Sequence, residues 1–147
     1  MILDKSQLLG LLFSSLLITP FSAFGHHAFA AEYDADKPIT LNGKLTKIEW
    51  INPHGYVHVD AKDAGGKPAD WLIEFGAPNA LLRKGFRKTD FPVGSDVVVK
   101  GYQAKNGANA AAASTVTLPD GRSFYAGSEG TGAPGDPSAA KPAAAAQ

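Results

Sequence analysis

In one extended segment the apolar side chains switch from one face of the strand to the other, and this switch constrains the fold of the chain most strongly. In residues 39 to 50 the apolar side chains of the first half fall on one face and those of the second half on the other: Ile39, Leu41 and Leu45, then Ile48 and Trp50. A regular strand cannot bury both sets, because its side chains alternate between two faces. We therefore predict a bulge or coil near residues 43 to 47, which lets one strand serve two sides of a closed sheet.

The remaining strand pattern lies between Pro38 and Gly127. In residues 56 to 61, Val57 and Val59 share one face, and the opposite face carries polar and aromatic side chains. Turn residues separate further short apolar runs, which predict strands. The expected strands after the first are residues 56–61, 71–75, 97–102, 114–118 and 123–125.

A short helix is expected between the third and fourth strands. Pro78 suits the first helical position, and Gly85 can adopt the left-handed conformation that ends a helix. Three strands, a helix and two or more strands, with a kinked first strand, follow the order of an OB-fold. The prediction is an all-β fold with a small helical contribution, an OB-like barrel of five to six strands.

The first 25 residues predict an export signal. Lys5 precedes an unbroken run of eleven apolar and small residues, and Pro20 follows that run. The run is shorter than the roughly 20 residues of a membrane span, so we expect no membrane span in the mature form and a periplasmic or secreted location. Two cuts satisfy the small-residue rule, Gly25/His26 and Ala30/Ala31; the first is favoured because it lies closer to the apolar run.

Composition divides the rest of the chain. Residues 26–127 are expected to form one domain, and residues 128–147, which are rich in Gly, Ala, Pro and Ser, are predicted to be a disordered tail. The formal net charge is zero, so nucleic acid is not an expected partner. The chain has no cysteine and its single methionine is Met1, which excludes disulfides and disfavours copper(I) bound by soft sulfur ligands.

The four histidines of the chain are the candidate metal ligands: His26, His27, His54 and His58. A cut after Gly25 would leave His26 with a free amine, which can chelate a metal together with its own Nδ1. A second imidazole would complete the nitrogen-rich square arrangement that copper(II) prefers. We therefore predict a site for copper(II), or a similar divalent transition metal, made by His26 and His54, with His27 or His58 as the next ligand.

A metal-free alternative stays open from the same residues. A histidine on a strand face commonly only packs or forms hydrogen bonds, and the Asn-Pro-His-Gly segment is a natural turn that an imidazole can cap. In this alternative the barrel face binds a small ligand or a periplasmic partner protein. The candidate residues on that face are Trp50, Tyr56 and His58, with Asn52 beside them.

Catalytic residues are not predicted. Glu49 and Glu74 are expected to face water as strand residues rather than to form a carboxylate pair. No serine-histidine-aspartate spacing, phosphate loop or nucleotide fingerprint occurs. A binding or accessory role is therefore favoured, and an enzyme that uses copper for redox chemistry is the third possibility.

Five segments together resemble a family of small exported bacterial proteins of unknown function. The resemblance spans about residues 26–127 and implies export and an OB-like fold, without an activity. The tail beyond Gly127 lies outside it. The segments are HHAFAAEYD, NGKLTKIEWINPHGYVHVD, WLIEFGAPNALLRKGF, VGSDVVVKGY and TLPDGR.

Overall fold

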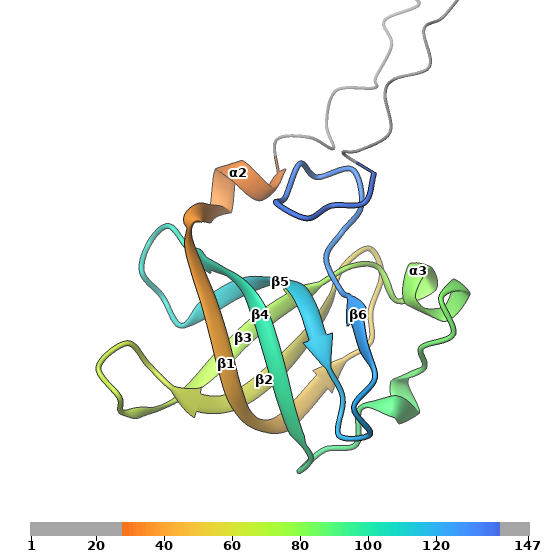
Figure 1. Ribbon diagram of the computed structural model, residues 1–147, viewed down its shortest axis with the longest axis horizontal. Helices are drawn as coiled ribbons and strands as arrows, with labels where there is room; N and C mark the ends of the chain where they lie inside the picture. The colour runs from red at the N-terminus through yellow and green to blue at the C-terminus, as the bar shows by residue number, and fades with distance from the viewer. Residues whose placement is uncertain (1–27, 139–147) are drawn as a thin grey trace, which may run out of the picture.

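Six strands close into a barrel in the computed structural model, which describes residues 28–138 (Figure 1). The predicted all-β, OB-like fold is therefore confirmed, including a short helix between the third and fourth strands. The strands are β1 (Tyr33–Glu49), β2 (Gly55–Lys62), β3 (Pro68–Phe75), β4 (Asp96–Ala104), β5 (Ala110–Thr117) and β6 (Ser123–Tyr125). The helical elements are α2 (Ala28–Glu32), α3 (Pro78–Arg83) and the 3₁₀ helix η1 (Lys88–Asp90).

The sheet has the strand order β3-β2-β1-β4-β5-β6, and neighbours in this order are antiparallel. A parallel pairing between β3 and β5, from Leu72 opposite Ala110 to Glu74 opposite Ala112, closes the ring. The long strand β1 pairs with β4 through most of its length and with β2 through its second half. One continuous strand thus belongs to both sides of the barrel.

The predicted irregularity in β1 is confirmed. Leu45 pairs with Val59 and Lys47 pairs with His58, so the register of β1 against β2 shifts by one residue at Thr46. Leu45 is buried before the shift, and Ile48 after it packs against the same core. The bulge therefore resolves the change of phase, because the apolar residues on either side of it reach one interior.

Two apolar clusters hold the elements together. The main cluster fills the barrel and includes fully buried Val59, Ile73 and Val99. A second, smaller cluster lies where α2 meets the loop that follows β6. Figure 1 shows α2 and this loop beside each other. It consists of Phe29, Tyr33, Ala104 and Ala133.

The structure describes residues 128–138, the first eleven residues of the segment that is expected to be a disordered tail. Asp136 is only 4% exposed, and its carboxylate accepts hydrogen bonds from the backbone N–H groups of Gly130, Thr131 and Ser138. This local network orders a segment whose composition provides almost no apolar area. The predicted export signal, His26, His27 and the last nine residues lie outside the described residues.

None of the helices found within residues 28–138 has the length and apolar character that crossing a membrane requires.

Candidate functional site beneath α2

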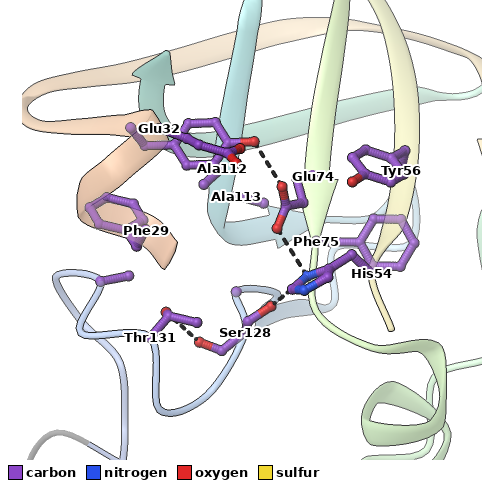
Figure 2. Close-up of a pocket in the computed structure, with 13 residues that line it drawn as sticks. Phe29, Glu32, His54, Tyr56, Glu74, Phe75, Ala112, Ala113, Ser128 and Thr131 are labelled. Atoms are coloured by element: carbon purple, nitrogen blue, oxygen red, sulfur yellow. Dashed lines mark hydrogen bonds and ion pairs between the residues drawn. The ribbon is translucent and has the colours of Figure 1, made fainter. Parts of the chain in front are cut away.

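A cavity of about 170 Å³ lies on the outer surface of the barrel, where α2 and the loop after β6 cover strands β2, β3 and β5 (Figure 2). Aromatic rings, carboxylates and one imidazole share its wall. The residues that line it are Phe29, Glu32, Tyr33, His54, Tyr56, Glu74, Phe75, Ala112, Ala113, Gly127, Ser128, Thr131 and Ala133.

Strand alternation places two polar side chains in this wall. In β2, Val57 and Val59 point into the core, so Tyr56 faces outward. In β3, Ile73 is fully buried, and its neighbour Glu74 faces the opposite side. Because Tyr56 and Glu74 are directly paired in register, they lie side by side under α2.

Glu74 connects the amino-terminal region to the loop that carries His54. Its Oε2 accepts a hydrogen bond of 2.8 Å from the Tyr33 hydroxyl, and its Oε1 lies 3.0 Å from His54 Nδ1. Ser128 Oγ is 3.2 Å from the same nitrogen. Figure 2 shows the contacts of His54 with Glu74 and Ser128 along one wall of the cavity.

These contacts indicate the tautomer of His54. Nδ1 beside a carboxylate is the nitrogen that carries a hydrogen and donates it, with Glu74 as the nearer acceptor. Within residues 28–138, the polar contacts of His54 all involve Nδ1. A neutral imidazole held this way keeps the lone pair of Nε2 for a metal or for a hydrogen-bond donor.

The electrostatic environment of the cavity is negative. Burial, and then the charge and hydrogen bond of Glu74, raise the pKa of Tyr33 far above its ordinary value. Burial also raises the pKa of Tyr56, and the carboxylates of Glu74, Glu32 and Glu49 raise it further. Both phenols therefore stay protonated, and Tyr33 remains a hydrogen-bond donor to Glu74.

His58 has a different environment from His54 and does not line the cavity. Its Nδ1 lies 3.1 Å from Asp70 Oδ2, and its Nε2 lies 3.3 Å from Glu49 Oε1. Hydrogen bonds from Lys47 and then His58 hold the pKa of Glu49 below its ordinary value. Both ring nitrogens of His58 thus have carboxylate neighbours, and Glu49 and Glu74 serve two separate networks.

The ligand-binding candidates Trp50 and Asn52 also lie outside the cavity lining. The Trp50 ring is 5.7 Å from the rings of both Phe75 and Phe91, so it extends the barrel core. Asn52 Oδ1 accepts a hydrogen bond of 3.4 Å from the backbone of Asn79 at the start of α3. Of the four residues proposed to bind a ligand, Trp50, Asn52, Tyr56 and His58, the cavity includes Tyr56 alone.

Sequence reasoning missed Tyr33, Ser128 and the role of Glu74. The alternation of residues in β3 predicts that Glu74 faces outward, but no pattern in the sequence indicates that α2 covers it. Ser128 belongs to the segment that was expected to be a tail. Within residues 28–138 there is no group of three or more His, Cys, Asp or Glu side chains that could hold a metal ion. His26 and His27 lie outside these residues.

Comparison with protein families gives one match: residues 15–113 fit the model of a family of unknown function (DUF6152). The matched region runs through β1 to β4 and ends within β5. Comparisons with curated proteins and with solved structures gave no match.

Proposed function

The chain belongs to the DUF6152 family of unknown function, and we propose that it is an exported, periplasmic protein that binds copper(II) or a similar divalent transition metal. His54 provides one imidazole, and the processed amino terminus at His26 provides the amine and a second imidazole. Metal delivery or storage fits this site better than catalysis: the Ser128 hydroxyl contacts His54 at Nδ1, the nitrogen that donates to Glu74, so the imidazole does not act as its base.

The contact between His54 Nδ1 and Glu74 carries this proposal. Histidines that bind metals commonly donate their other ring N–H to a carboxylate, which fixes the tautomer and makes the ligand more basic. The distance of 3.0 Å between Nδ1 and Glu74 Oε1 fits that arrangement and leaves Nε2 for the metal. The Tyr33 hydroxyl in turn fixes the other carboxylate oxygen of Glu74, at 2.8 Å.

The position of Phe29 supports the contribution of the amino terminus. Phe29 lines the cavity that contains His54, and His26 precedes it by three residues. Since consecutive Cα atoms are about 3.8 Å apart, the Cα of His26 lies within roughly 11 Å of the Cα of Phe29. The amine and imidazole of His26 can therefore reach the cavity. His27 is the next available ligand, whereas both ring nitrogens of His58 have carboxylate neighbours.

The donor set favours copper(II). One amine and two imidazoles give three nitrogen ligands without sulfur, which is the set that copper(II) accepts in a square arrangement. Glu32 and Glu74 add negative charge near the ion, and this charge favours a divalent cation.

The test uses protein exported and processed by the cell, with its first residue determined by mass spectrometry. Metal-free protein is titrated with copper(II), and the visible and electron paramagnetic resonance spectra are followed. We expect saturation at one equivalent and nitrogen hyperfine structure. His54→Ala should remove this signal. His26→Ala keeps the terminal amine and His27, so it should alter the spectrum and weaken binding. Glu74→Gln should weaken binding by roughly 10- to 100-fold through the loss of imidazole orientation.

His58→Ala is the matched control, because it removes an imidazole from the same strand region without touching the cavity. It should leave the copper spectrum and affinity unchanged. A mature protein that starts at Ala31, or a His54→Ala variant with the original spectrum and affinity, would refute the proposed site.

A further inference from the structure

We infer that the cavity beneath α2 also binds a small organic cation, an amine or a quaternary ammonium group, between Tyr56 and the carboxylates of Glu32 and Glu74. This inference goes beyond the copper site and does not depend on it. It involves only residues that line the cavity, and it concerns protein from which metal has been removed.

The size of the cavity exceeds what an ion requires. Its volume is about 170 Å³, whereas roughly 10–15 Å³ suffices for one water molecule. The cavity therefore has room for a compact organic group. Carboxylates and aromatic rings both line its wall, so the occupant should carry both a charge and an apolar surface.

The charge of the wall selects a cation. Among the lining residues, Glu32 and Glu74 are acidic, His54 is the one side chain that can become positive, and there is no lysine or arginine. The two carboxylates therefore make the wall acidic. The carboxylates of Glu74 and Glu32 both act on the Tyr56 hydroxyl, which lines the same cavity.

Aromatic rings provide the rest of the recognition. Phe29, Tyr56 and Phe75 line the cavity, as Figure 2 shows. Tyr33 lines it too, and its hydroxyl donates a hydrogen bond to Glu74. The face of an aromatic ring attracts a cation, and cages of such rings bind quaternary ammonium groups. Rings combined with carboxylates, without a competing lysine or arginine in the lining, are the chemistry that an ammonium ligand requires.

Choline is the probe, and its neutral isostere 3,3-dimethylbutan-1-ol is the control ligand. Binding to mature, metal-stripped protein is measured by calorimetry and by the aromatic proton resonances. We expect saturable binding of choline and a much weaker response to the isostere. Tyr56→Leu should weaken choline binding by about 3- to 30-fold, and Tyr56→Phe, which keeps the ring, should retain it. Glu32→Gln should weaken binding several-fold.

Asp96→Asn is the matched control for charge, because Asp96 pairs with Lys44 at the opposite end of β4 from the cavity. It should leave choline affinity unchanged. His54→Ala separates the two proposals: it should abolish copper binding and retain choline binding. No saturable choline binding, or equal affinity for the isostere, would overturn the inference, whereas loss of the copper signal alone would leave it standing.

Discussion

Two tyrosines of this protein place their hydroxyl groups in opposite situations. Tyr33 donates a hydrogen bond to the largely buried carboxylate of Glu74, whose side chain is 18% exposed. Tyr125 has a buried hydroxyl without a hydrogen-bond partner among the described residues. Replacing either tyrosine with phenylalanine removes the same oxygen atom, but the two substitutions should affect the free energy of unfolding differently.

We predict that Tyr33→Phe lowers the free energy of unfolding by roughly 1.5–3 kcal/mol, the range for hydrogen bonds to charged groups. Tyr125→Phe should leave the free energy of unfolding unchanged or raise it, because the variant no longer buries an unpaired hydroxyl. Urea denaturation at neutral pH measures both. Equal destabilisation of the two variants would contradict this reading of the contacts.

The ionisation of Tyr125 should affect the stability of the protein at alkaline pH. Burial, and then the carboxylates of Asp136 and Glu129, raise the pKa of Tyr125 to about 12. The unfolded chain loses this proton near pH 10, and the folded protein keeps it to about pH 12. The stability linked to Tyr125 is therefore fully present below about pH 10 and is lost as the pH rises towards 12.

The measurement compares unfolding of the original protein and Tyr125→Phe at a series of pH values from 8 upward. Lysines titrate in both proteins, so only the difference between the two curves is informative. We expect the variant to gain relative stability above about pH 10. Parallel curves over this range would show that Tyr125 ionises normally.

Among the strands, β1 depends on a close approach at Gly43. A Cβ atom at this position would lie 2.3 Å from the carbonyl oxygen of Asp60 in β2, far below van der Waals contact. Gly43→Ala should force the two strands apart just before the bulge. We expect a loss of about 1–3 kcal/mol in the free energy of unfolding, as for other overpacked sites.

Gly65→Ala is the control for Gly43→Ala. Gly65 lies in the turn between β2 and β3, and the nearest atom to its added Cβ would be a side-chain oxygen of Asp63, at 3.3 Å. Its effect should stay within about 0.5 kcal/mol. Thermal unfolding compares the midpoints of the two variants, and equal midpoints would contradict the role of Gly43.

The barrel was predictable from sequence because its signals are local. Alternation in β2 and β3, and the change of phase around Thr46, depend on neighbours along the chain. The cavity was not predictable, because Tyr33 and Glu74 are 41 residues apart and meet only after the ring closes. The order of the loop at Asp136 depends on backbone hydrogen bonds, which composition does not reveal.

For the whole molecule, the two cuts predicted from the sequence, before His26 and before Ala31, should differ in their effect on stability. Phe29 is 7% exposed and packs against Tyr33 and Tyr102, with ring centroids 5.8 and 5.6 Å away. A cut before Ala31 would remove this anchor of α2. We predict that protein starting at Ala31 is less stable than protein starting at His26, by a free energy on the order of 3 kcal/mol, as for loss of a buried phenylalanine.

Phe29→Ala in protein that starts at His26 is the matched variant. It should reproduce most of the loss, because it removes the same ring and keeps the rest of the segment. Chemical denaturation of the three proteins provides the comparison. Equal stability of the proteins that start at His26 and Ala31 would show that α2 contributes little to the fold.

The cavity wall combines α2, at the beginning of the described chain, with the loop after β6, at its end. An affinity tag or fluorescent fusion placed next to residue 28 or residue 138 would therefore crowd the site that it is meant to report on. The turn between β2 and β3 is the better position for a label. It is separated from the His54 loop by the eight residues of β2, which span about 26 Å at ~3.3 Å per residue.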